Sequence, residues 1–125
     1  MILYNCTAYR NKGGNFGFSQ LIGAGKILEI KNCVAVDGKV AIADFAIQET
    51  NNWMSPFIVT PDDFSSLDTT GITGPRKADG SLPDVKFVHL VRGSDLIDAG
   101  TNLGIPYTGK APDLGAFEFS SNNTY

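Results

Sequence analysis

The residues best suited to binding a sugar are Tyr9, Arg10, Lys12, Asn15 and Trp53. The first four lie close together in the sequence, and an arginine can bind a carboxylate through two parallel hydrogen bonds. Trp53 offers an aromatic face on which a sugar ring can rest. The alternative is that Arg10 and Lys12 belong to a turn that is polar in any case, and that Trp53 anchors a loop in the core. The sequence leaves both interpretations open, with these five residues as the candidate substrate-binding site.

No residue stands in a context that indicates catalysis. A lysine base needs a pKa that is lowered by burial or by a neighbouring cation. Lys26, Lys31 and Lys39 all fall at turns or at outward positions, so we predict solvated surface charges. His89 stands alone in an expected strand, which favours a structural or half-exposed side chain. The sequence contains no nucleophile elbow and no phosphate-binding loop, so we assign no catalytic residue.

The carboxylates do not form a convincing metal site. Calcium needs several oxygen ligands that converge on one point. Asp62 and Asp63 are the densest pair, but a position at the start of a helix explains Asp63 more simply. Asp95 and Asp98 can bracket a cation, yet aspartates in short turns usually bond to their own backbone. We assign no metal ligand and no cofactor to this chain.

Two similar segments, Leu3–Ala8 and Ile30–Ala35, organise the amino-terminal part of the chain. Their offset is 27 residues (32 − 5), which aligns Asn5 with Asn32. Asparagine enters the left-handed backbone region more readily than other non-glycine residues, so each Asn can form a corner between two short strands. Stacked corners would let the two Asn side chains bond to each other. Such a repeat predicts successive coils of a parallel β-helix.

The same alignment stacks Cys6 on Cys33, with both side chains pointing inward. Adjacent coils would bring the two cysteines within bridging distance, so a disulfide is one interpretation. The other is a pair of small buried thiols. We expect reduced thiols, because inward stacked residues rarely have the Cβ geometry that a disulfide needs. A metal site is not expected, since the only histidine, His89, has no spaced partner.

The expected coils occupy residues 1–48. Their strand segments are, in order, residues 2–9, the alternating Phe16, Phe18 and Leu21, residues 27–36, and the alternating Val40, Ile42 and Phe45. Inward positions are predicted at Leu3, Cys6 and Ala8 in the first coil and at Leu28, Ile30, Cys33 and Ala35 in the second. The residues between these positions, Val34 among them, are expected to face outward.

Residues 49–119 are expected to form a loop-rich cap on the coils. Thr60, Pro61 and Asp63 have the order of a helix start, so we predict one short helix that ends near Leu67. The remaining expected elements are a surface loop over residues 68–83, a turn over 94–100, and strands over 85–91 and 114–119. Residues 120–125 have little apolar content and are expected to be a loose tail. The chain is thus predicted to be one all-β domain.

Composition and charge argue against several partners. The chain has 125 residues, a formal charge of −3 and scattered basic residues, so nucleic acid is not expected to bind. No segment approaches the roughly 18 consecutive apolar residues of a membrane span. Met1 is not followed by a signal peptide. Because a strand that begins at residue 2 leaves an open edge, we expect a preceding coil or a homodimer through this amino-terminal coil.

Four segments carry a resemblance to a known family. They are Leu3–Asn11 with the Gly-Asn-aromatic sequence that follows, Gly74–Asp84, Gly93–Gly100 and Ala111–Glu118. They resemble the late coils and the carboxyl-terminal region of secreted bacterial pectate lyases of polysaccharide lyase family nine. The resemblance implies a partial, right-handed parallel β-helix. It also implies a family that cleaves by calcium-dependent β-elimination, with a lysine base and an aspartate cluster.

In that family the lysine and the aspartates lie on coils that precede the matched stretch, and no position of this chain corresponds to them. The expected function is therefore that of a carboxyl-terminal fragment of a pectate-lyase-like protein, structural and inactive on its own. Such a parent protein would be extracellular or periplasmic. The alternative is a stand-alone carbohydrate-binding or assembly module with the same fold. An acidic polysaccharide is the expected partner of the candidate site.

Overall fold

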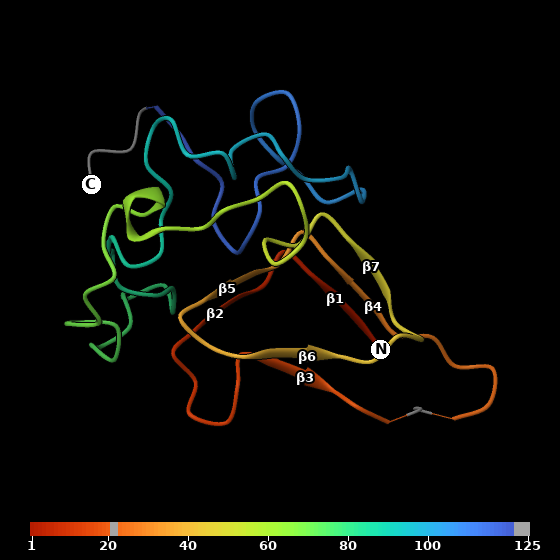
Figure 1. The fold of residues 1–125 in the computed structure, drawn as a ribbon. Coiled ribbons are helices and arrows are strands. Elements are labelled where there is room, and N and C mark those ends of the chain that lie inside the picture. The colour runs from red at the N-terminus through yellow and green to blue at the C-terminus, as the bar shows by residue number, and fades with distance from the viewer. Residues whose placement is uncertain (21–22, 122–125) are drawn as a thin grey trace.

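Three small parallel sheets form the sides of a triangular prism in the computed structural model, which describes residues 1–20 and 23–121 (Figure 1). Their strands are β1 (Ile2–Tyr4), β2 (Thr7–Tyr9), β3 (Phe16–Phe18), β4 (Glu29–Lys31), β5 (Val34–Val36), β6 (Val40–Ile42) and β7 (Ile47–Glu49). The sheets have the orders β1-β4-β7, β2-β5 and β3-β6. Every strand pair is parallel, so the chain climbs one level with each circuit. The predicted parallel β-helix is confirmed.

The predicted 27-residue register is also confirmed. Leu3 pairs with Ile30 and Ala8 pairs with Ala35. The corner residues Asn5 and Asn32 have φ angles of 51° and 56°, in the left-handed region that the sequence predicted. The sharp corner lets a strand pair on both sides of it without an intervening loop.

A third corner was missed in the sequence. Strand β7 pairs with β4, and Thr50 follows it with a φ of 51°, above Asn32. The offset falls from 27 to 18 residues (50 − 32), and the corner residue is no longer Asn. Strand β7 therefore crosses residue 48, where the sequence placed the end of the coils.

The Asn side chains do not bond to each other in the way predicted for stacked corners. Asn5 Nδ2 donates to the carbonyl of Asp113 (3.0 Å), and Asn32 Nδ2 donates to the carbonyl of Thr101 (2.8 Å). Asn32 Oδ1 accepts from Thr101 N (2.9 Å) and from the Thr50 hydroxyl (2.5 Å). The corner amides thus tie the coils to loops from the carboxyl-terminal part of the chain.

Apolar side chains fill the inside of the prism. Phe16, Ile30 and Cys33 are buried there, and the side chains packed against them are Leu3, Cys6, Ala8, Phe18, Ala35, Val40, Ile42 and Trp53. Leu28 is also buried. These burial values confirm the inward positions that the sequence predicted for the two coils. Phe45 was expected to continue the strand with Val40 and Ile42, but it lies in an exposed turn after β6. Leu21 lies outside the described residues.

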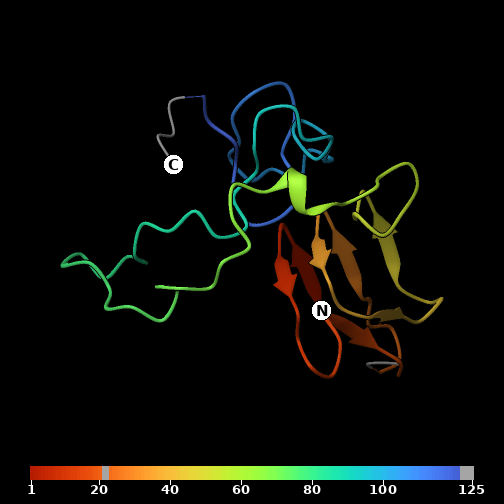
Figure 2. The same ribbon diagram turned by 60° about the vertical axis from the view of Figure 1, so that its left-hand side comes forward.

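A second apolar cluster lies outside the prism, between the β2–β5 sheet and the cap. Val34 and Val36 of β5 are only 1% and 5% exposed, and they pack against Phe64, Val88, Leu90, Leu96 and Leu114. The carboxyl-terminal segments cover this face of the β2–β5 sheet (Figures 1 and 2). Val34 points outward from the prism as predicted and is buried there by the cap, because a parallel strand that is covered on both faces is apolar at every position.

The cap contains less regular structure than predicted. The helix is a single 3-10 turn, η1 (Pro61–Asp63), which begins as predicted but ends well before Leu67. Its start is held by a hydrogen bond from Thr60 N to the Asp63 carboxylate (2.8 Å), which confirms the capping role of Asp63. The turn predicted over residues 94–100 is present.

The strands predicted over residues 85–91 and 114–119 are absent. Only two isolated bridges, Phe64 with Leu90 and Ser66 with Phe87, represent the first of them. Val88 has a φ of 53° and Gly115 a φ of 91°, and a left-handed residue interrupts an extended segment. Residues 68–83 form the predicted surface loop, which projects from the body as an arm (Figure 2). Residues 122–125 of the predicted tail lie outside the described residues.

The Asn32 corner yields a first prediction. An Asn32→Ala substitution is expected to lower the free energy of unfolding by about 3 kcal/mol, because it leaves Thr101 N–H and C=O unpaired and strains a left-handed residue. Asn32→Gly removes the same hydrogen bonds but relieves the backbone, so its loss should be about 1 kcal/mol smaller. Urea denaturation measures both. Equal losses would show that the left-handed backbone contributes nothing.

The cysteines yield a second prediction. Both are free thiols, and Cys33 is fully buried. Burial raises the pKa of the Cys33 thiol to about 12, so at pH 8 its reactive thiolate fraction is on the order of one in 10,000. A thiol reagent is expected to reach Cys33 only as fast as the protein unfolds, and the half-buried Cys6 sooner. Unfolding without reductant should expose two thiols. A mass lower by two hydrogens, with no thiol found, would show a disulfide instead.

Candidate functional site

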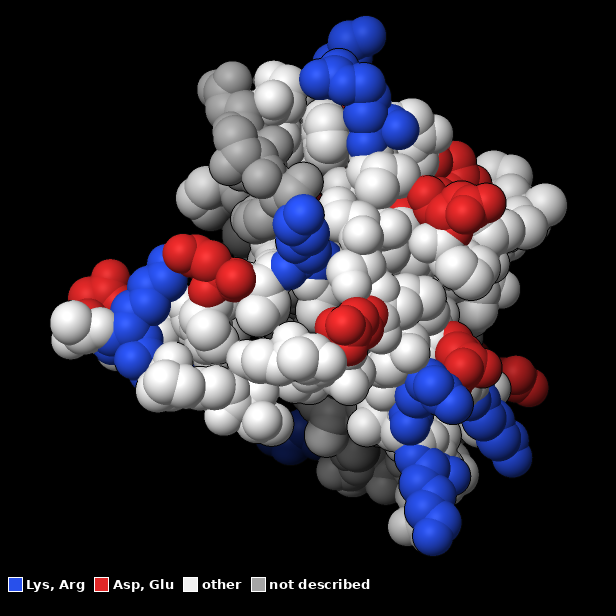
Figure 3. Space-filling model, turned by 90° about the vertical axis from the view of Figure 1, so that its left-hand side faces the viewer, with Lys and Arg blue, Asp and Glu red and all other residues white. Residues whose placement is uncertain are grey.

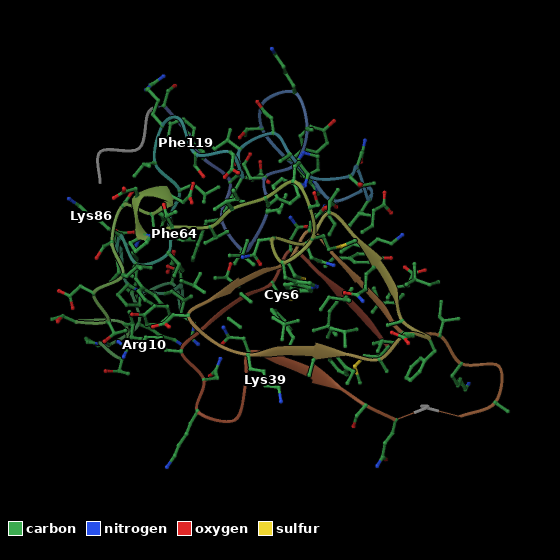
Figure 4. All side chains as sticks on the ribbon, viewed as in Figure 1. Cys6, Arg10, Lys39, Phe64, Lys86 and Phe119 are labelled. Atoms are coloured by element: carbon green, nitrogen blue, oxygen red, sulfur yellow. The ribbon has the colours of Figure 1, made fainter. Side chains whose placement is uncertain are left out.

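Four of the five candidate sugar-binding residues lie together at one corner of the prism. Tyr9 ends strand β2, and Arg10, Lys12 and Asn15 belong to the turn that leads to β3. The next coil contributes Asp37 and Lys39 in the corresponding turn between β5 and β6 (Figure 4). We call Arg10, Lys12 and Lys39 the basic corner. On the face shown in Figure 3, basic side chains gather at one lower corner, next to acidic ones.

Backbone hydrogen bonds stack the two turns of the basic corner. Arg10 N donates to Val36 O (3.1 Å), and Asn15 N donates to Lys39 O (2.7 Å). Asn15 Nδ2 also donates to Val36 O (3.0 Å), while its Oδ1 accepts from the backbone and side-chain amides of Asn11 (3.1 Å each). The Asn15 amide therefore holds the turn together. Asn15 therefore positions the turn that carries Arg10 and Lys12.

Arg10 is an accessible candidate for binding a ligand carboxylate. Its side chain is 63% exposed and makes an ion pair with Asp37 (Nε to Oδ2, 3.2 Å), whose side chain is 71% exposed. The guanidinium carbon lies 5.9 Å from the centre of the Tyr9 ring. The interaction with Tyr9, followed by the charge of Asp37, raises the pKa of Arg10, so it is cationic at every working pH. An exposed ion pair of this kind is weak, so a ligand carboxylate that binds Arg10 through two hydrogen bonds can replace Asp37 as its partner.

Tyr9 separates two grooves. The first, of about 540 Å³, lies between residues 7–11 and a wall formed by Thr69, Ile72, Phe87 and Val88. The second, of about 460 Å³, lies between residues 35–37, Asn52 and residues 59–61. The Tyr9 ring meets the Phe87 ring edge to face, with centroids 5.1 Å apart. Both volumes are in the range that accommodates a small ligand.

Trp53 does not join this site. Its indole Nε1 donates to Gln48 Oε1 (2.9 Å), and its ring lies 5.3 Å from the ring of Phe16, inside the prism. The residue closes the interior next to the last coil turn. This position fits the alternative interpretation, in which Trp53 anchors a loop.

Lys31 is not the solvated surface lysine that the sequence predicted. Its side chain is only 16% exposed and lies between two carboxylates of the same sheet, 3.3 Å from Glu49 and 4.0 Å from Glu29. The Tyr4 hydroxyl donates to Glu29, and the Thr101 hydroxyl donates to Glu49 (2.8 Å). The Thr101 hydrogen bond, followed by Lys31, holds the pKa of Glu49 below its usual value. Lys31 is therefore the centre of an ion-pair cluster on the β1-β4-β7 sheet.

The signal for this cluster was present in the sequence. Glu29 and Lys31 are two residues apart and so share one face of a strand, but Glu49 could be added only once β7 was known. His89 is half-buried, as predicted, with its ring stacked on Phe117 (centroids 3.9 Å apart), and burial lowers its pKa. Within residues 1–20 and 23–121, no three His, Cys, Asp or Glu side chains are arranged to hold a metal ion. No helix of the described chain is long and apolar enough to cross a membrane.

Comparison with known proteins agrees with the fold and the resemblance. The chain is 39% identical over 115 residues to pectate lyase L of Dickeya chrysanthemi and to that of Dickeya dadantii, covering 91% of this chain. It superposes on the crystal structure of pectate lyase Pel9A with a TM-score of 0.87 and 38% identity over 95% of its length. The chain spans 27% of the length of the two curated relatives and 30% of the solved structure. No family model matches the sequence.

The close packing of the basic corner yields a third prediction. A Cβ added at Gly38 would overlap the Asn15 side chain, so Gly38→Ala is expected to lower the free energy of unfolding by about 1–3 kcal/mol. Gly13, in the adjoining turn, has open space around the position of a Cβ and serves as the matched control. Gly13→Ala should leave the thermal midpoint almost unchanged. If both variants melt alike, Asn15 does not pack as described.

Proposed function

We propose that this chain is the structural, carboxyl-terminal β-helix part of a pectate-lyase-like protein that degrades polysaccharide. In sequence and fold it resembles the carboxyl-terminal part of a right-handed parallel β-helix pectate lyase. The observation that carries the proposal is the identity of 39% over 91% of this chain against 27% of the relatives. The resemblance therefore covers this chain almost completely and the relatives only in part. Pectate is a polymer that cells degrade from outside, so we place the parent protein in the periplasm or outside the cell.

The environment of the lysines and carboxylates supports the proposal that this part is inactive on its own. Lys31 has a mostly buried side chain and makes an ion pair with each of two carboxylates, so its amine is engaged within the sheet. The other two lysines that we considered, Lys26 and Lys39, are exposed. None of these three lysines is a buried amine without a carboxylate partner, which supports the proposal.

Three neighbouring carboxylates of the cap, those of Asp98, Asp113 and Glu118, are not arranged to bind calcium, the ion that the family uses. Asp113 Oδ1 and Oδ2 accept from the amides of Asp98 (2.8 Å) and Phe119 (2.5 Å). Glu118 Oε1 accepts from Asp113 N (3.0 Å), and Asp98 Oδ1 accepts from Lys110 N (2.8 Å). Burial raises the pKa of Asp113 and of Glu118. These carboxylate oxygens accept hydrogen bonds from backbone amides and so stabilise the loop. They do not converge on one point, as calcium ligands must.

The fourth prediction is that the purified chain does not cleave polygalacturonate. With calcium present at alkaline pH, absorbance of unsaturated uronide should stay at the level of the blank, because neither the base nor the calcium ligands are provided. A full-length relative assayed in parallel is the positive control. Product formed by the purified chain and abolished by a chelator would refute the structural assignment.

A second candidate function is binding of an acidic polysaccharide at the basic corner. Arg10, Lys12 and Lys39 are exposed on two stacked turns although the chain has a formal charge of −3, and Tyr9, next to Arg10, lines both grooves. Uronate carboxylates repeat along a polygalacturonate chain, so several weak contacts can add up. This function would serve equally in a stand-alone module and in the fragment of a lyase.

The fifth prediction tests this binding by calorimetry with a galacturonate oligomer. Arg10→Gln is expected to weaken the affinity roughly tenfold, which is about 1.4 kcal/mol. The matched control is Arg92→Gln, because Arg92 is an exposed arginine that lies over Phe119 in the cap, away from the basic corner. The affinity of the unchanged protein should fall as salt is added. Equal affinities for the two variants, or no binding by the unchanged protein, would remove the basic corner as a binding site.

A further inference from the structure

One edge of strand β2 is open. In a parallel pair, alternate residues direct their backbone groups to the two opposite sides. Arg10 N donates to Val36 O (3.1 Å), so the backbone groups in step with Arg10 face β5. Thr7 and Tyr9 are out of step with Arg10 and therefore direct their N–H and C=O groups to the other side. On that side β2 has no strand neighbour in the described part of the chain.

The groove of about 540 Å³ runs along this open edge. Thr7, Ala8 and Tyr9 line it. The Ala8 side chain packs inside the prism, so the groove reaches Ala8 through the backbone at the edge of the strand. The opposite wall is formed by Thr69, Ile72, Phe87 and Val88. The groove thus has a strand edge on one side and mostly apolar side chains on the other.

The wall of this groove belongs to the arm (residues 68–83) and to the cap behind it. In Figure 2 the coils stack from the red β1 and β2 to the yellow β7, and the green arm extends past β2 on the side away from β5. The arm therefore lies alongside the space next to the first coil. It also continues an existing interface, since Tyr9, Phe87 and Val88 pack in the same apolar cluster as Val34 and Val36.

Local interactions hold the arm in shape. Thr70 N donates to Asp68 Oδ1 (2.9 Å) at its start, and Lys77 Nζ pairs with Asp84 Oδ1 (2.6 Å) near its end. The Ile72 side chain remains 37% exposed on the wall of the groove. Loops longer than roughly 12–15 residues without regular structure usually have a function. A preformed arm with an apolar side chain beside an open strand edge indicates a binding surface.

The occupant that fits this surface is a coil of a parallel β-helix. Strands β1, β2 and β3 each have one strand neighbour in the described chain, in the next coil, so their open edges lie in one layer. A further coil can pair with all three in the register by which the first coil pairs with the second. The last coil of a second copy cannot do so, because Asn52 covers the outer edge of β5 by binding Cys33 O and Ala35 N. The two curated relatives extend well beyond the matched stretch, which is 27% of their length.

We propose that the arm and the open edges of β1, β2 and β3 bind a further coil, which the upstream part of the parent protein supplies. This inference rests on the proposed function as a carboxyl-terminal β-helix part. The arm clamps the outer face of that coil, as the cap covers the outer face of β5. The strand next to β2 must then be apolar on both faces, as β5 is. The second groove and the exposed side chains of the basic corner remain available to a polymer.

The test joins this chain to the upstream part of one of the two curated relatives, in place of the relative's own matching stretch. Hydrogen exchange of the Thr7 and Tyr9 amides is compared between the isolated chain and this chimera. Both amides are expected to exchange about a hundredfold more slowly in the chimera, because the added strand supplies their acceptors.

Ile72→Asp tests the arm separately from the strand edges. It is expected to lower the thermal midpoint of the chimera by about 3 °C and that of the isolated chain by less than about 1 °C, because only the chimera buries the new charge. Ile58→Asp is the matched control, since Ile58 is 75% exposed and lies outside the arm. It should change both midpoints equally.

Protected Thr7 and Tyr9 amides in the chimera, together with a larger effect of Ile72→Asp there, support the proposal. Equal exchange in the two proteins, or equal effects of Ile72→Asp, overturn it, and so does a chimera that does not fold. Protection of both amides in a dimer of the isolated chain would place a second copy at the edge and overturn it as well. A chimera with protected amides but without lyase activity contradicts the proposed function alone.

Discussion

The structure depends on one buried corner residue, Asn32, that joins three parts of the chain. Its backbone N–H donates to Glu49 O (3.2 Å), and its carbonyl accepts from Gly115 N (2.8 Å). Its side chain binds both backbone groups of Thr101. A Cβ at Gly100 would lie 3.0 Å from the same side chain, so glycine is required where the loop passes. The left-handed corner thus fixes the coil register and the position of the cap together.

The location of the cap explains why the coils differ on their three sides. The β2–β5 sheet is apolar on both faces because the cluster around Phe64, Leu96 and Leu114 covers it. The outer face of the β1-β4-β7 sheet carries the Glu29–Lys31–Glu49 cluster, with Thr101 from the cap loop bound to Glu49. The turns between β2 and β3 and between β5 and β6 border the two grooves beside the cap, and the side chains of the basic corner are exposed there. A polymer could therefore contact this corner without moving the cap.

The sequence predicted what short-range chemistry determines, and failed where distant segments decide. The repeat around Asn5 and Asn32 was readable because a left-handed corner strongly favours asparagine. Thr50 has no such preference, so the third corner was visible only from its pairing with the second coil. The strands expected near Val88 and Leu114 do not form, because the first segment makes single bonds and isolated bridges to residues 63–66, and the second makes single bonds to Leu96 and Asn32. The separation of Trp53 from the other four candidate sugar-binding residues has a similar cause. Its ring packs against Phe16 and its indole N–H bonds to Gln48, in the interior of the prism.

The central claim is that coils and cap are one cooperative unit joined at Asn32. Native-state hydrogen exchange of individual amides tests it most directly, because it measures the opening free energy of each hydrogen bond. The amides of Gly115 and Thr101, which bind Asn32 from the cap, should open with the same free energy as the amide of Val34 within the coils. If the two cap amides exchange through a much less costly opening while Val34 stays protected, the cap is separate from the coils and the account is contradicted.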